Sequence, residues 1–159
     1  MWVELNVAEQ RLATYLANAR YAISRKDSLT NAKIGPQSNE LTDLEGIGGE
    51  LAFCKLMNIY PDIQLGDRPL ADATLWNGLR VDIKTTVYKD GSLLAAHWKD
   101  GVGVDLYALM VGKFPRYRLA GLMDSKELLK PERLKDFGYG QSYAAAQSEL
   151  SMVKCKGFT

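Results

Sequence analysis

The sequence has few of the residues that build disulfide or zinc frameworks. It contains two cysteines, Cys54 and Cys155, which are far apart in the chain, and a single histidine. Neither a disulfide scaffold nor a zinc knuckle is therefore predicted. The sequence also lacks a basic, apolar leader at its start, an apolar run of membrane-spanning length, internal repeats and low-complexity tracts. We expect a protein of the reducing cytoplasm that has no membrane contact.

The sequence also has no large excess of positive or negative charge. The 20 lysine and arginine residues are balanced by 19 aspartate and glutamate residues, which gives a formal net charge of +1. This balance argues against a strongly basic protein that binds nucleic acid mainly through its overall positive charge. The two halves differ, because residues 1–79 carry 7 basic and 10 acidic side chains whereas residues 80–159 carry 13 and 9. Contacts with phosphate groups are therefore expected from the second half.

The stretch over residues 72–87, DATLWNGLRVDIKTTV, is typical of a β-hairpin. Asn77-Gly78 is a turn signal, and strand-like residues flank it on both sides. After the turn, apolar and polar residues alternate as they do in a β-strand. This alternation predicts that Asp82 and Lys84 lie side by side on one face of the strand.

Two registers of this hairpin are possible, and they differ in where Asp72 lies. A two-residue loop would put Asp72 on the face opposite to Asp82, because a slip of one residue turns every side chain over. A three-residue loop with Gly78 in a left-handed bulge pairs Ala73 with Val81 and sets Asp72 across from Asp82. We favour this second register because it pairs apolar with apolar residues. It places two carboxylates opposite each other, an arrangement that is repulsive unless a cation lies between them.

A helix is predicted over residues 42–58, and Glu50 is its informative residue. Glu50 lies on the stripe of this helix that should face the core, together with Ile47, Leu51, Cys54 and Met57. A carboxylate there is costly unless it is paired, bound to metal or able to reach solvent. Glu45 is expected to be an ordinary exposed charge. Gly48 and Gly49 allow two interpretations, close packing of the helix on a sheet or close approach to a phosphate backbone.

The other elements follow from periodicity and turn signals. The length of 159 residues predicts a single domain over residues 1–159. It would consist of an N-terminal helix and polar loop over residues 1–40 and a core over residues 42–130 that contains the hairpin 71–88. Strands are predicted over residues 93–96, 105–112 and 116–123, with the last two antiparallel, and a short helix over residues 125–129. Residues 144–150 fit a helix or a strand.

The residues Glu50, Asp72 and Asp82-Ile83-Lys84 together resemble the PD-(D/E)XK nuclease superfamily, the fold of many restriction enzymes, resolvases and phage nucleases. In that family an acidic residue opens one strand of a hairpin, an acid-x-Lys triplet lies on the next strand, and an earlier helix adds a glutamate. Here Ala71 stands where the family often has proline. The resemblance spans about residues 44–130. The alternative, non-functional interpretation of the same residues is a half-exposed hairpin whose polar face is solvated.

The resemblance implies an α/β protein with a restriction-endonuclease-like mixed β-sheet core flanked by helices. It implies a Mg²⁺-dependent nuclease, with Mn²⁺ as a possible substitute, that hydrolyses phosphodiester bonds of nucleic acid, in the first place DNA. Asp72, Asp82 and the Ile83 carbonyl would bind the metal. Glu50 would bind a second ion or orient a water, and Lys84 would position that water and stabilise negative charge.

Nucleic-acid contacts are expected from a basic cluster of Lys113, Arg116 and Arg118, or from Gly48 and Gly49. A sheet edge protected by charges explains the basic cluster equally well. Two alternatives to the nuclease stay open. The first is a catalytically silent nuclease-like fold that binds nucleic acid or protein as a phage accessory module. The second is a Holliday junction resolvase, which would act as a homodimer. A partner protein could supply DNA affinity, and the expected setting is a bacterial or phage-infected cytoplasm.

Overall fold

The computed structural model describes residues 1–26 and 39–152, so most of the polar loop expected up to residue 40 lies outside the described residues. The described chain forms two β-sheets and three α-helices, α1 (Val7–Lys26), α2 (Asn39–Met57) and α3 (Ser125–Leu128). The larger sheet has the strand order β1-β6-β5-β3-β2. Its strands are β1 (Trp2–Glu4), β2 (Ala73–Thr74), β3 (Arg80–Thr86), β5 (Leu106–Lys113) and β6 (Arg116–Asp124). The smaller sheet has the order β4-β8-β7, with β4 (Leu93–Ala96), β7 (Leu134–Asp136) and β8 (Gln141–Ala145).

The larger sheet is mixed, which confirms the expected α/β class. β3 and β5 are parallel, whereas the pairs β1–β6, β5–β6 and β2–β3 are antiparallel. Two parallel strands cannot be joined by a tight turn. The chain therefore leaves β3, adds β4 to the smaller sheet and returns to β5. This excursion brings residues of the β4–β5 connection back to the level at which β3 begins.

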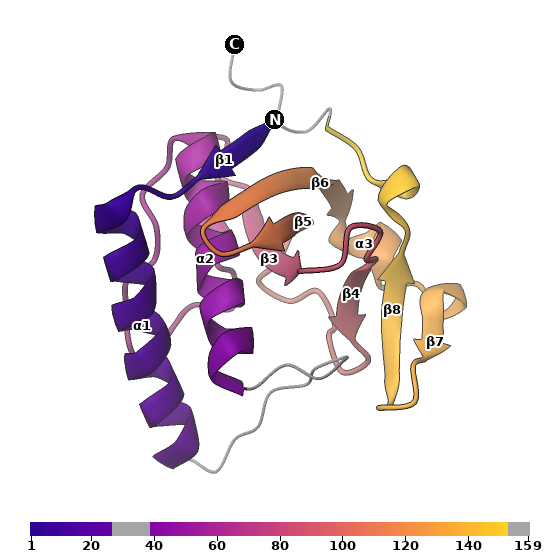
Figure 1. Cartoon of the computed structure of the whole chain (residues 1–159). Coiled ribbons are helices and arrows are strands. Elements are labelled where there is room, and N and C mark those ends of the chain that lie inside the picture. Colours follow the sequence, from indigo (N-terminus) through magenta and orange to yellow (C-terminus); the bar gives the residue numbers. More distant parts are fainter. Residues whose placement is uncertain (27–38, 153–159) are drawn as a thin grey trace.

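The central strand β5 separates two apolar cores, as its continuous apolar sequence predicts. Leu106, Ala108 and Met110 point into the core that α1 and α2 cover. The alternate side chains of Tyr107 and Leu109 point into a second core under the smaller sheet and α3. In Figure 1, α1 and α2 lie on one side of the larger sheet and β4, β8 and β7 lie on the other. Both faces of β3 and β5 are consequently covered.

The N-terminal helix agrees with the prediction in its bounds but not in its buried face. The sequence predicts a helix over residues 7–25 with an apolar stripe of Ala8, Leu12, Tyr15, Leu16, Ala19 and Ile23. Leu16 is buried as predicted, whereas Tyr15 and Ile23 are exposed, and Ala17 and Arg20 complete the buried face. A charged residue on the inner face of α1 is therefore part of the fold, and its partners lie in the candidate site described below. No helix within the described ranges is long and apolar enough to span a membrane.

Two expectations for α2 and the C-terminal region need correction. Glu45 is buried rather than exposed, because it accepts hydrogen bonds from the Phe114 N–H at 3.0 Å and from the Tyr117 hydroxyl at 2.9 Å. Burial raises the pKa of Glu45, and the two hydrogen bonds oppose this shift. The sequence predicts a polar loop over residues 139–143, but residues 141–145 form β8, which lies between β4 and β7 in the smaller sheet. A short 3₁₀ turn, Gln147–Glu149, follows β8.

The glycines of α2 serve packing. Gly48 and Gly49 are both buried, and a Cβ atom at either position would overlap a side chain of the sheet, namely the Tyr117 hydroxyl at Gly48 and Thr85 Oγ1 at Gly49. α2 can therefore lie closer to β3 and β6 than a helix of larger residues could. Packing on the sheet accounts for both residues, and neither is available to a phosphate backbone.

A pair of alanine substitutions tests this close packing. Gly46→Ala meets no atom within 4 Å and should stabilise the protein by up to about 1 kcal/mol, because alanine favours helix. Gly49→Ala should destabilise it by about 1 kcal/mol or more, because the added methyl group overpacks against Thr85. Urea unfolding followed by circular dichroism measures both changes. Equal stability of the two variants would contradict the packing argument.

Candidate active site

The hairpin adopts the register with the three-residue loop. Ala73 pairs with Val81, and the Leu75 N–H donates to the Leu79 carbonyl at 2.9 Å across the turn. Gly78 has a φ of +84°, the left-handed conformation that the bulge requires. Continuing this register places Asp72 opposite Asp82, as predicted, with Asp72 directly before the first residue of β2.

Asp82 is the most deeply buried carboxylate of the cluster, with 2 % of the residue exposed. Two ammonium groups neutralise it. Lys84 Nζ lies 2.5 Å from Asp82 Oδ1, and Lys99 Nζ lies 3.4 Å from Oδ2. Within the described residues, Asp82 Oδ1 is buried without a well-aligned hydrogen bond, and so is the hydroxyl of Tyr107. Tyr107 is the register partner of Asp82 on β5 and therefore projects from the same face of the sheet.

Asp72 closes the edge of the sheet beside Asp82. Its Oδ2 accepts a hydrogen bond of 2.7 Å from the Ile83 N–H. The N–H and C=O of one strand residue point to the same side, so the Ile83 carbonyl also faces this edge. Burial and the nearby charge of Asp82 raise the pKa of the Asp72 carboxyl, and the Ile83 hydrogen bond opposes this shift. Asp72, Asp82 and the Ile83 backbone thus form one polar edge.

Glu50 approaches the same edge from α2. Its Oε2 lies 3.1 Å from Arg68 and 3.5 Å from Arg20. Burial, followed by the charge of Asp72, raises the pKa of Glu50 to about 7 in spite of both guanidinium groups. Lys84 also acts on this carboxyl and lowers its pKa, so the Glu50 carboxyl lies within electrostatic range of the Asp82–Lys84 pair. The predicted stripe of α2 is confirmed, since Ile47, Leu51, Cys54 and Met57 are buried.

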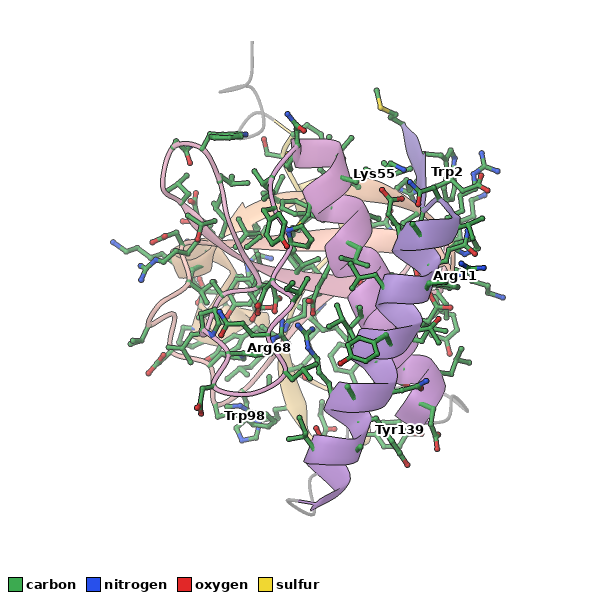
Figure 2. All side chains as sticks on the ribbon, turned by 90° about the vertical axis from the view of Figure 1, so that its left-hand side faces the viewer. Trp2, Arg11, Lys55, Arg68, Trp98 and Tyr139 are labelled. Carbon is green, nitrogen blue, oxygen red and sulfur yellow. The ribbon has the colours of Figure 1, made fainter. Side chains whose placement is uncertain are left out.

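Four residues of the cluster were missed by the sequence analysis: Arg20, Asp62, Arg68 and Lys99. Arg68 connects the acids, because it contacts Asp62 at 3.0 Å, Glu50 at 3.1 Å and Asp72 at 3.5 Å. Arg20 reaches in from α1 and donates to the backbone carbonyls of Asp62 at 3.0 Å and Gln64 at 3.1 Å. Figure 2 views the molecule from the α1 side, with Arg68 beside the two helices. A charge four residues after Leu16, on the inner stripe of α1, was the available signal for Arg20.

The cluster straddles the edge of the larger sheet. Val81 and Ile83 point into the core under α2, whereas Asp82 and Lys84 point to the other face. β2 pairs with β3 only through Ala73 and Thr74. In the described chain β3 has no further strand partner on that side, so groups from both faces can meet around the edge.

The cluster neutralises itself. Four carboxylates, those of Glu50, Asp62, Asp72 and Asp82, are matched by four cations, which are Arg20, Arg68, Lys84 and Lys99. Within residues 1–26 and 39–152, no three His, Cys, Asp or Glu side chains lie together as a ready metal-binding group. The arginine guanidinium of Arg68, rather than a gap, lies between Glu50 and Asp72.

The predicted basic cluster lies away from these acids. Asp82 pairs in register with Tyr107, and Lys113 is six residues further along β5, a separation of about 20 Å at the usual strand rise. Arg116 lies over the Trp2 ring at 5.0 Å, and Arg118 donates to the Gln147 side chain at 2.9 Å. Arg116 and Arg118 lie on β6, which runs between β1 and β5, so they do not protect an edge of the larger sheet. Their contacts do not bring the basic cluster to the acidic one.

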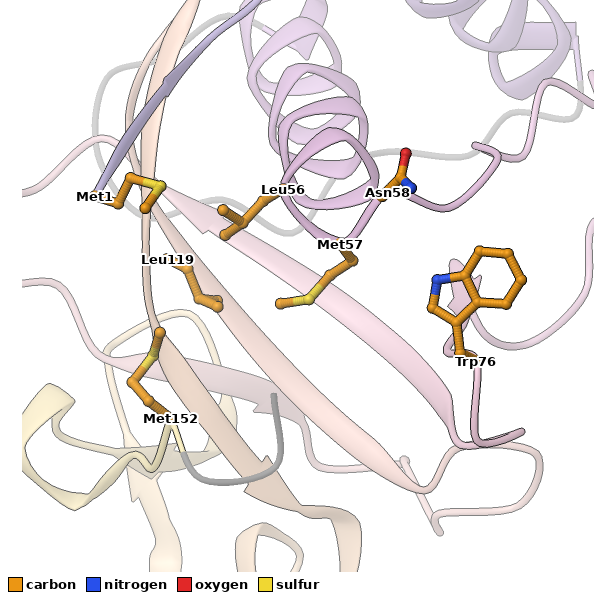
Figure 3. Close-up of a pocket in the computed structure, with 7 residues that line it drawn as sticks. All are labelled: Met1, Leu56, Met57, Asn58, Trp76, Leu119 and Met152. Atoms are coloured by element: carbon orange, nitrogen blue, oxygen red, sulfur yellow. The ribbon is translucent and has the colours of Figure 1, made fainter. Parts of the chain in front are cut away.

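Two hollows open near the hairpin. A pocket of about 450 Å³ is lined by apolar side chains at the end of α2 and by Trp76, and no predicted site residue lines it (Figure 3). A larger open groove of about 780 Å³ runs along the hairpin and includes Asp62, Asp72, Tyr60 and Trp76. Tyr60 is 80 % exposed and Trp76 is 70 % exposed. The groove therefore joins exposed aromatic rings to the acidic cluster.

Comparisons with known proteins add no relative to this description. No family model matches the sequence, and neither the curated proteins nor the solved structures contain a match to this chain.

The raised pKa of Glu50 predicts how stability depends on pH. A carboxyl whose pKa is about 7 in the folded state and near 4.5 in the unfolded state takes up a proton on folding. The free energy of unfolding should therefore fall as the pH rises from 4.5 to 7, by on the order of 3 kcal/mol, and then level off. Glu50→Gln removes the titration. The stability of this variant relative to wild type should increase between pH 5 and pH 8.

Urea unfolding at both pH values measures this difference. Glu127→Gln, which changes an exposed glutamate outside the cluster, serves as the control and should keep a constant offset from wild type. If Glu50→Gln also kept a constant difference in stability from wild type, the folded protein would not disfavour the ionised form of Glu50.

Proposed function

We propose that this chain is a metal-dependent nuclease with a restriction-endonuclease-like fold of the PD-(D/E)XK type. One observation carries the proposal. The four residues selected from sequence, Glu50, Asp72, Asp82 and Lys84, come from α2, from the residue before β2 and from β3, and their charged groups gather at one sheet edge. A hairpin whose polar face is only solvated would neither bury Asp82 nor have Glu50 of α2 beside it.

The oxygen atoms at this edge suit a hard divalent cation such as Mg²⁺, with Mn²⁺ as a substitute. Asp82 Oδ1 is buried and lacks a well-aligned hydrogen bond among the described residues, and the Ile83 carbonyl faces the same edge as Asp72. Asp72, Asp82 and the Ile83 carbonyl would hold the ion, and Glu50 would bind a second ion or orient a water. A bound divalent ion would lower the pKa of its water and counter the charge of the phosphate.

Lys84 and the groove give the site a side from which substrate can enter. The Lys84 side chain is 34 % exposed although its ammonium contacts a carboxylate that is almost wholly buried. It can therefore orient a water and stabilise negative charge on a phosphate while remaining on Asp82. The exposed rings of Tyr60 and Trp76 in the neighbouring groove offer stacking faces for nucleic-acid bases.

The self-neutralised charges favour one alternative, a nuclease-like domain that binds nucleic acid or protein without cleaving it. In that case the four carboxylates and four cations would form a purely structural network. The two functions differ in the response to metal, because a structural network gains nothing from a divalent ion. Neither the homodimer of a resolvase nor a partner protein is needed to explain the geometry of the single chain.

Cleavage assays test the nuclease directly. The substrates are linear duplex, single strand, supercoiled plasmid and a four-way junction, each with Mg²⁺ and with Mn²⁺. We expect cutting by wild type, loss of at least about 100-fold in Asp82→Asn and Lys84→Ala, and unchanged cutting by the control Asp90→Asn, which alters an exposed aspartate. Near-normal cleavage by purified, folded Asp82→Asn would overturn the mechanism.

Arg68 provides a test that requires no catalysis. Its guanidinium and a divalent ion would compete for Glu50 and Asp72, so Arg68→Gln should raise the affinity for Mg²⁺ several-fold in titration calorimetry. Arg80→Gln, which breaks an exposed arginine pair with Asp105, is the matched control and should leave the affinity unchanged. An affinity that is equal or weaker in Arg68→Gln would contradict a metal site between these carboxylates.

A further inference from the structure

We propose that Lys99 is a second catalytic lysine of this site and binds a phosphate oxygen of the substrate beside the scissile bond. The proposal rests on the proposed nuclease function and adds a residue that the acid-x-Lys triplet does not contain. Lys99 follows β4 of the smaller sheet, fifteen positions after Lys84 in the chain. Only the return of the chain from the smaller sheet brings it to Asp82.

At Asp82, positive charge locally exceeds negative charge. One carboxylate with 2 % of its residue exposed faces two ammonium groups, Lys84 at Oδ1 and Lys99 at Oδ2. One lysine is enough to compensate one buried carboxylate. The cluster as a whole is neutral, because three carboxylates surround Arg20 and Arg68. At Asp82 itself, however, two ammonium groups face one carboxylate, and a phosphate oxygen can meet this local positive charge.

Both lysines are partly exposed to solvent, and Lys99 makes the longer contact with Asp82. The side chains of Lys84 and Lys99 are 34 % and 33 % exposed, so both ammonium groups can be reached from solvent. The Lys99 contact of 3.4 Å is clearly longer than the Lys84 contact of 2.5 Å. Within the described chain, Asp82 is the one carboxylate that pairs with Lys99. Of the two lysines, Lys99 would therefore lose less interaction energy on leaving Asp82 to bind a phosphate oxygen.

The backbone of Lys99 is held in place by hydrogen bonds of its turn. The Lys99 N–H donates to the Ala96 carbonyl at 3.0 Å, which ties the residue to the end of β4. The Val102 N–H donates to Asp100 Oδ1 at 2.9 Å, and the Val104 N–H donates to the Gly101 carbonyl at 3.2 Å. These hydrogen bonds hold the turn closed. A phosphate-binding lysine on such a turn is positioned before substrate arrives, which limits the loss of entropy on binding.

The other basic residues lie far from Asp82 or are already paired. The predicted phosphate-binding cluster around Lys113 is about 20 Å from the level of Asp82 along β5. Arg20 is fixed by two backbone carbonyls, and Arg68 is occupied by three carboxylates. Lys99 and Lys84 are therefore the cations of the described chain that are both accessible and adjacent to Asp82.

The test compares wild type with Lys99→Gln, Lys99→Arg and Lys126→Gln. Lys126 is an exposed lysine of α3, so its glutamine variant makes the same change of charge outside the site. The first readout is kcat and KM for the substrate that wild type cuts in the panel above. The second is binding of the same oligonucleotide with Ca²⁺ in place of Mg²⁺, under conditions in which no product forms. Binding is measured by fluorescence anisotropy as a function of salt concentration, and urea unfolding checks that each variant is folded.

We expect Lys99→Gln to lower kcat/KM by on the order of 100-fold and to reduce the slope of log affinity against log salt concentration by about one. Lys99→Arg should retain the salt slope and part of the activity, and Lys126→Gln should match wild type. A Lys99→Gln variant that is less stable but keeps the wild-type salt slope and kcat would overturn the proposal, because Lys99 would then only neutralise Asp82. Wild type that cuts no substrate in the panel would overturn the nuclease function and this role together.

Discussion

The candidate site depends on the burial of Asp82. A carboxylate removed from water is costly unless cations and hydrogen bonds replace its hydration. Lys84 supplies one cation from the same strand, and Lys99 supplies the other from the connection between β4 and β5. The segment between β3 and β5, which passes through the smaller sheet, is therefore linked to the site by the Lys99–Asp82 ion pair as well as by packing.

The shortness of β2 leaves an edge of β3 without a strand partner beside this buried charge. Because β2 covers only two residues of the hairpin, the edge of β3 beside Ile83 is left to the side chain of Asp72 instead of to a strand. Unpaired sheet edges are normally protected by charges, and here the protecting charge is also a candidate metal ligand. The same opening lets Glu50 reach from α2 toward residues on the other face of the sheet.

Arginine resolves the repulsion that four neighbouring carboxylates would otherwise cause. Arg68 bridges Glu50, Asp62 and Asp72, and Arg20 anchors the connection that carries Asp62 and Arg68 to α1. The protein can therefore keep its acids together without a bound ion. This arrangement also explains why the pKa of Glu50 is raised to about 7 rather than further, since the two guanidinium groups oppose the effect of burial.

The sequence by itself determined the local features of this protein. Alternation and the Asn77-Gly78 turn specified the hairpin and its register, because a period of two and a bulge leave only one pairing that matches apolar with apolar residues. The position of Glu50 on an apolar stripe marked it as a special carboxylate. Only the tertiary structure decided the rest. Lys99 reaches Asp82 through the crossover that makes β3 and β5 parallel, and Arg20 reaches the site because α1 packs against the connection that carries Asp62 and Arg68. Glu45 is buried by hydrogen bonds to the hairpin between β5 and β6. No local periodicity records which charges such tertiary contacts bring together.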